Sequence, residues 1–142
     1  GISVFGVGSF HDDKEGKDRG KNTMFRIHVD DMVVAHLGDL GHTLSDKAVD
    51  QLGEVDVLLV PVGGIYTIGP KEAVEVTTQI EPTIVIPMHY KVAGISSDFE
   101  GLNTVDDFLK AASAEGAQRL NKLAVTQADL PEEREVIVLE RV

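Results

Sequence analysis

Cysteine is absent from the sequence, and this absence removes several classes of site. Without cysteine there is no disulfide framework, no zinc site built on thiolates and no thiol nucleophile. The sequence also lacks an apolar run of about 18 residues, which a membrane-spanning helix needs, so we expect no membrane span. No basic segment followed by an apolar stretch marks a secretory signal, and a cytoplasmic location is the resulting expectation.

Positive charge is scarce, because 13 Lys and Arg residues stand against 24 Asp and Glu, giving a formal net charge of −11. A surface that binds nucleic-acid phosphates needs clustered Lys and Arg, so this balance argues against nucleic acid as a partner. An anionic small-molecule substrate stays compatible with it, since a bound metal ion reverses the local field. The length of 142 residues, with 42% apolar and 26% charged residues, is typical of one globular domain.

Apolar patterns and turn residues predict an α/β fold, a mixed sheet with helices packed on it. The first ten residues predict a strand, and strands over 23–29 and from Met32, joined by Asp30-Asp31, predict an antiparallel hairpin. The later predicted elements are, in order, a helix over 46–52, a strand over 55–62, a helix from 70 that stops at Glu81-Pro82, a strand over 83–88, a helix over 104–114 and weaker strands over 120–125 and 136–142.

Three of these strands end at a possible metal ligand. Asp39 follows the strand from Met32, between Gly38 and Gly41, and His11 and His89 follow two other strands. Loops at strand ends gather at one edge of an α/β sheet, and imidazole and carboxylate are ligands for zinc and similar ions. His11, Asp39 and His89 are therefore candidate metal ligands. For each residue alone, an ordinary turn carboxylate or a hydrogen-bonded structural histidine is the alternative.

Five motifs together resemble the metallo-β-lactamase superfamily. They are SFHD at 9–12, RGKNTMFRI at 19–27, HLGDLGH at 36–42, VPVGGIYTIGPKEA at 60–73 and IVIPMHY at 84–90. The resemblance covers residues 1–91 and is to the C-terminal half of that fold, in the branch of metal-dependent hydrolases that includes ascorbate-6-phosphate lactonase-like proteins. It implies half of an αββα sandwich, a mixed sheet with helices packed on one face. It also implies that residues 1–142 form a single domain, the C-terminal portion of a longer metallo-hydrolase; the start at Gly1, without Met, leads us to expect a fragment.

The resemblance implies roles for particular residues. His11 and His89 match metal-binding histidines, and Asp39 matches an aspartate that bridges two divalent ions, most often zinc, with manganese or iron as alternatives. Such ions lower the pKa of a bridging water from about 15.7 to roughly 7, which makes hydroxide available to attack an ester, lactone or phosphoester. Asp39, which would orient this hydroxide, and His42 are the candidate catalytic residues. His42 and His36 are candidates for moving a proton or orienting a ligand.

The family's principal signature, His-x-His-x-Asp-His, occurs nowhere in the 142 residues. One interpretation is therefore a hydrolase portion that is inactive or incomplete without its N-terminal half. The alternative is a non-catalytic α/β module that binds a partner or self-associates, and an isolated single-metal site is a third interpretation. A sandwich that lacks one half exposes an apolar sheet face, so we expect a homo-oligomer, a domain-swapped form or association with the missing half.

Overall fold

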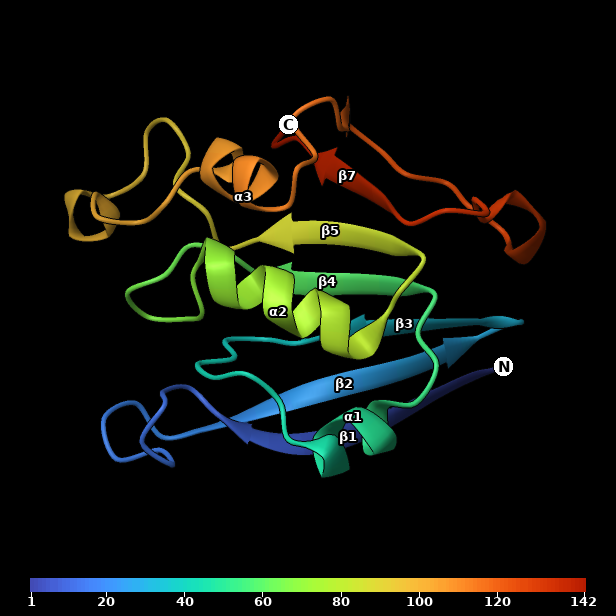
Figure 1. The fold of residues 1–142 in the computed structure, drawn as a ribbon, viewed down its shortest axis with the longest axis horizontal. Coiled ribbons are helices and arrows are strands. Elements are labelled where there is room, and N and C mark those ends of the chain that lie inside the picture. Colours follow the sequence, from blue (N-terminus) through green and yellow to red (C-terminus); the bar gives the residue numbers. More distant parts are fainter.

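The computed structural model describes all 142 residues and contains one seven-stranded sheet with three α-helices on one of its faces (Figure 1). The strands are β1 (Ile2–Phe10), β2 (Lys21–Val29), β3 (Met32–His36), β4 (Val57–Pro61), β5 (Ile84–Met88), β6 (Gln118–Leu120) and β7 (Glu135–Leu139). The α-helices are α1 (Asp46–Leu52), α2 (Pro70–Ile80) and α3 (Val105–Ala111), and the short 3-10 helices are η1 (Ser97–Phe99) and η2 (Gln127–Asp129). None of the helices has both the length and the apolar character that crossing a membrane requires.

The sheet has the order β1-β2-β3-β4-β5-β7-β6 and is mixed, as the sequence predicts. β2 runs antiparallel to both β1 and β3, whereas β3, β4, β5 and β7 pair in parallel. Two antiparallel steps restore the original direction, so β1 runs the same way as β3, β4 and β5 (Figure 1). The carboxyl ends of these four strands therefore share one edge of the sheet, where α/β folds place their sites.

Most predicted elements are present, with small changes at their ends. The predicted hairpin is confirmed, since Val29 pairs with Met32 across Asp30-Asp31. The third helix is shorter than predicted and ends at Ala111 rather than at residue 114. The strand predicted over 120–125 is wrong beyond Leu120, where β6 ends. Leu123 and Val125 pack on the sheet face away from the helices, so their apolar character reflects burial without strand pairing.

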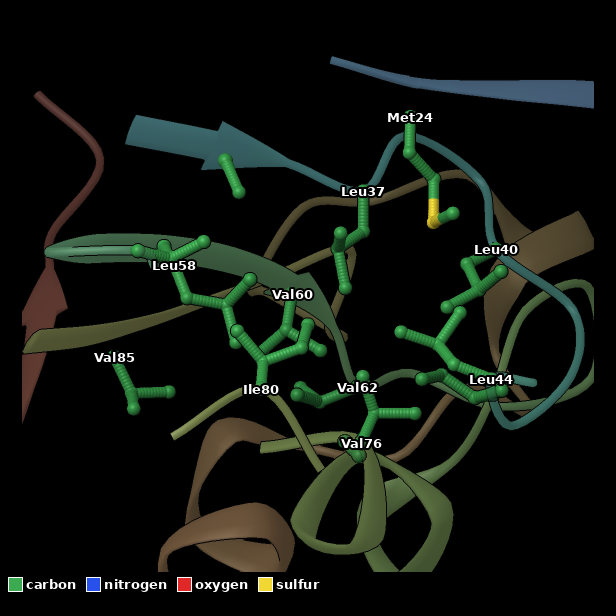
Figure 2. Packing of buried hydrophobic residues seen from close by; sticks show 14 of the residues in the cluster. Met24, Leu37, Leu40, Leu44, Leu58, Val60, Val62, Val76, Ile80 and Val85 are labelled. Atoms are coloured by element: carbon green, nitrogen blue, oxygen red, sulfur yellow. The ribbon is translucent and has the colours of Figure 1, made fainter. Parts of the chain in front are cut away.

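The helices cover one face of the sheet with the main core. This cluster of 22 buried residues joins side chains of β3, β4 and β5 to those of all three helices, as Figure 2 shows for Leu58, Val60 and Val76. The opposite face carries a smaller cluster of five buried residues, covered in part by the segment 120–130. Apolar side chains stay exposed on β1, where Ile2 is 70% and Phe5 58% exposed. Because successive side chains of a strand point to opposite faces, these two do not form one patch, and the expected association stays a prediction.

Candidate metal centre

The shared edge of the sheet brings His11, Asp39 and His89 together. His11 follows β1, Asp39 lies three residues beyond β3, and His89 follows β5. The His11 Nε2 atom lies 3.4 Å from Asp39 Oδ2, and the His89 Nε2 atom lies 3.0 Å from Asp39 Oδ1. Each carboxylate oxygen thus faces one imidazole nitrogen. The side chains of Asp39 and His89 are nearly half exposed, so the cluster opens to solvent.

The donor set fits a divalent metal ion in its chemistry, since two imidazoles and a carboxylate are all zinc ligands. The His11 Nδ1 atom is buried and has no hydrogen-bond partner, so His11 is not held as a hydrogen-bonded structural histidine. The three donors do not by themselves form a group that would hold one ion. The role of the three residues as ligands stays a prediction.

His89 has a left-handed backbone conformation, with φ at 56°, which residues other than glycine rarely adopt. Strain of this kind persists only where the surrounding structure enforces it, and it concentrates at functional sites. Gly63, two residues beyond β4, lies against the His89 backbone so closely that a Cβ atom there would collide with the His89 carbonyl oxygen. The sequence predicts the two glycines after β4 only as the end of a strand, and in the structure Gly63 also makes room for the turn that directs His89 toward Asp39.

Asn22 fixes the loop that carries Asp39. Its Oδ1 accepts a hydrogen bond from the Asp39 backbone N–H at 3.0 Å. Its Nδ2 donates to the carbonyl of Leu37 at 2.9 Å and to the hydroxyl of Ser9 at 2.9 Å. Asn22 therefore ties the ends of β1 and β3 together beside the site. The sequence gives no sign of this role, although Asn22 lies within the motif at 19–27, because the spacing of a single asparagine near the start of a strand does not reveal its partners.

Both ring nitrogens of His42 are engaged with the backbone. Nε2 accepts a hydrogen bond from the Phe10 N–H at 3.0 Å, and Nδ1 lies 2.7 Å from the Thr43 carbonyl, to which it donates in the matching tautomer. The adjacent Gly41 donates its N–H to the Phe10 carbonyl at 2.9 Å. These contacts hold the Asp39 loop against the end of β1, and proton transfer by His42 would have to break one of them. His36 likewise uses its Nδ1, which accepts from the Gly38 N–H at 3.1 Å.

Asp12 organises the loop between β1 and β2. Its carboxylate is buried and accepts four backbone N–H groups, those of Lys14, Gly16, Asp18 and Arg19, at 2.7 to 2.9 Å. Burial acts to raise the pKa of Asp12, but the four hydrogen bonds outweigh it and hold this pKa well below its usual value. The loop is thus folded around a charged carboxylate directly after His11. The sequence shows only a charged stretch with glycines, which predicts a loop and nothing of its internal order.

A cleft of about 710 Å³ opens over the three candidate ligands. Such a volume is within the range of small-molecule sites. Tyr66 and Tyr90 both line this cleft, whereas the sequence alone does not decide whether either tyrosine faces the site. Burial, together with the charge of Glu140, raises the pKa of Tyr90, whose hydroxyl donates to the Leu139 carbonyl at 3.3 Å. The remaining wall residues are Arg19, Gly64, Thr67, Ile95, Phe99 and Leu102.

Comparison with known proteins gives related metal-dependent hydrolases. A UPF0173 metal-dependent hydrolase from Thermococcus onnurineus is 33% identical over 92 residues, which are 63% of this chain and 41% of the relative. One from Methanopyrus kandleri is 46% identical over 57 residues, 40% of this chain and 25% of the relative. These matches span less than half the length of the curated relatives.

Among solved structures, a Thermotoga maritima protein assigned to the Zn-dependent hydrolases of the metallo-β-lactamase superfamily superposes with a TM-score of 0.82 at 44% identity. The match covers 98% of this chain and 65% of that one, so the sheet and its helices correspond to part of the metallo-β-lactamase fold. The family model described as a beta-lactamase superfamily domain matches residues 1–89, which include His11, Asp39 and His89. Because this match takes in more than half of the 142 residues, the chain belongs to the metallo-β-lactamase superfamily.

Proposed function

We propose that this chain is the C-terminal portion of a metal-dependent hydrolase that acts on a small-molecule ester, lactone or phosphoester. The observation that supports this most is that two histidines face opposite oxygens of one aspartate in the floor of a cleft. The related metal-dependent hydrolases point the same way. The ascorbate-6-phosphate lactonase-like branch is the part of the superfamily to which we assign it.

In this proposal His11 and His89 would supply nitrogen donors, and Asp39 carboxylate oxygens, to the metal ions. The bound ions, zinc in the first instance and manganese or iron as alternatives, supply a hydroxide nucleophile at neutral pH and polarise the bond to be cleaved. Asp39 would also hold and orient the hydroxide that the ions supply. His42 keeps the loop of Asp39 in register with His11, a positioning role that its two backbone contacts favour over proton transfer.

We propose that the remaining ligands come from a segment carrying the His-x-His-x-Asp-His signature, which these residues lack. The partial coverage of the relatives supports this, since 65% of the Thermotoga maritima chain is matched. The exposed apolar side chains of β1 favour association with that segment or with a second copy of this chain. They are equally the feature that would favour a non-catalytic module that binds a partner, which is the second candidate function.

Metal content tests the proposal directly. Zinc and manganese are measured by elemental analysis, after dialysis against trace amounts, for this chain and for a version extended at its N-terminus by the signature segment. We expect tight binding in the extended version only, with binding lost in Asp39→Ala. His11→Ala should likewise lose the metal, and His28→Ala is its matched control, because His28 is exposed on β2 and does not line the cleft.

Each outcome decides between the interpretations. Absence of metal from both versions would refute the hydrolase proposal and leave a binding module. Stoichiometric metal in the short chain would show that His11, Asp39 and His89 suffice, which would refute the division of the ligands between two portions. Hydrolysis of ester, lactone and phosphoester substrates by the loaded, extended version would then identify the reaction class.

A further inference from the structure

Arg19 is a cation without an anionic partner at the rim of the cleft. Its guanidinium makes no ion pair and no hydrogen bond within the protein, and its one specific contact is with the ring of Tyr66, 5.4 Å from its centre. Of the other four arginines, Arg119 pairs with Asp106, Arg26 and Arg134 donate to backbone carbonyls, and Arg141 is exposed near the last residue and is likewise unpaired. In a protein with a net charge of −11, an unpaired arginine beside a cleft calls for an explanation.

Two of the acidic residues in the loop that carries Arg19 are engaged with other groups. The carboxylate of Asp12 accepts hydrogen bonds from four backbone N–H groups, and one of these is the N–H of Arg19 itself at 2.7 Å. Asp18, the immediate neighbour, pairs with Lys14 at 2.9 Å. The guanidinium is therefore placed by its backbone and by Tyr66, and neither Asp12 nor Asp18 pairs with it.

Tyr66 is itself fixed, so the position of the guanidinium is prepared in advance. The hydroxyl of Tyr66 donates to the Asp98 carbonyl at 3.3 Å, and its ring packs edge-on against Phe99 at 5.8 Å. A guanidinium lying over an aromatic ring keeps its in-plane N–H groups free, and those groups match the two oxygens of a carboxylate or a phosphate. The cleft is also lined by three apolar side chains, those of Ile95, Phe99 and Leu102.

We propose that Arg19 is a specificity residue, which binds an oxyanion of the substrate, a carboxylate or a phosphate, while an apolar part of the same molecule lies against the wall formed by Ile95, Phe99 and Leu102. This inference rests on the proposed function, because it places the substrate in the cleft above Asp39. It defines the substrate as an amphiphilic anion and excludes uncharged esters and lactones as preferred substrates. The anion-binding group is separate from the candidate metal ligands.

The test measures binding of small anions to the metal-free chain, so that no metal ion competes for the oxyanion. Phenylacetate, phenylphosphonate and the uncharged phenylacetamide are titrated into ¹⁵N-labelled protein, and the Arg19 Nε–H signal is followed by NMR. We expect an anion to shift this signal and to bind about tenfold more tightly than phenylacetamide, as charge-assisted bonds allow. Whichever of phenylacetate and phenylphosphonate binds more tightly distinguishes a carboxylate from a phosphate.

Variants separate recognition from general charge effects. Arg19→Gln is expected to weaken anion binding about tenfold, and Arg19→Lys to recover part of the loss, because it restores the charge but not the planar fork. Lys17→Gln removes the same charge from the same loop outside the cleft and is expected to change affinity less than twofold. The inference is overturned if no anion binds, if phenylacetamide binds as well, or if Lys17→Gln matches Arg19→Gln.

Zinc content, measured on the extended version, keeps this inference distinct from the proposed function. If the extended version binds zinc and Arg19→Gln leaves the anion affinity unchanged, the role of Arg19 is overturned but the proposed function is not. Anion binding that depends on Arg19, in a protein that binds no metal even when extended, would overturn the hydrolase proposal and leave an anion-binding module.

Discussion

Replacing Asn22 by alanine should loosen the candidate centre without touching a candidate ligand. The substitution removes three side-chain hydrogen bonds, those to Ser9 Oγ, to the Leu37 carbonyl and from the Asp39 N–H. Each such bond contributes about 1 kcal/mol net, and Asn22 is half-buried, so water replaces part of what is lost. We therefore expect Asn22→Ala to lower the free energy of unfolding by about 2 kcal/mol.

Urea denaturation at a fixed protein concentration measures this difference, with an unchanged m-value showing that the unfolded state is the same. Asn121→Ala is the matched control, because Asn121 is exposed, and its change should stay within about 0.5 kcal/mol. The same Asn22 variant should weaken zinc binding by the extended version, since the Asp39 N–H loses its partner. A loss of stability below about 0.5 kcal/mol in Asn22→Ala would refute the idea that this side chain holds the loop.

Three further predictions concern the backbone around the site. Gly63→Ala should destabilise the fold by roughly 1–3 kcal/mol in thermal or urea unfolding, because its Cβ would displace the His89 carbonyl; an unchanged midpoint would contradict this. The folded-state pKa of Asp12 lies below its unfolded value, so the charged carboxylate stabilises the fold fully above about pH 4, and this stabilisation is lost as the pH falls further. When the free energy of unfolding is measured from pH 7 to pH 2, it should therefore fall less steeply for Asp12→Asn than for the wild type. His42→Ala should cost about 1–2 kcal/mol in urea unfolding by leaving the Phe10 N–H unpaired, whereas a loss of turnover in the extended version with unchanged stability and zinc affinity would favour proton transfer instead.

The strand pattern made much of the fold predictable. Apolar runs such as VLLV in β4 and IVI in β5 predict strands in the middle of a layered sheet, because such strands are buried on both faces. Pro70 at the start of α2 and the capping box of Thr104 with Asp107 at the start of α3 are local signals that survive in the structure. The strand predicted around Leu123 rested on apolar character alone. It was wrong because Leu123 is partly buried against the sheet without hydrogen bonding to a neighbouring strand.

The grouping of the three candidate ligands was predictable for the same reason, since strand direction alone brings His11, Asp39 and His89 to one edge. Their supports were not. The four bonds to Asp12 and the three of Asn22 link residues whose separation in sequence carries no periodicity, and only the folded backbone aligns them. The unpaired state of Arg19 could not be predicted either, because only the folded loop shows that Asp12 and Asp18 are bound to other groups.

The loops at this edge are bonded to one another and not only to their own strands. Asn22 joins the end of β1 to the loop of Asp39, His42 and Gly41 join that loop to Phe10, and the Ile68 N–H donates to the Leu40 carbonyl at 2.9 Å. Because these bonds lie within the chain, the positions of His11 and Asp39 do not require a second portion to order them. Adding the signature segment should therefore raise zinc affinity by supplying donors rather than by folding these loops, and the amide NMR shifts of residues 36–42 should change little in metal-free extended protein.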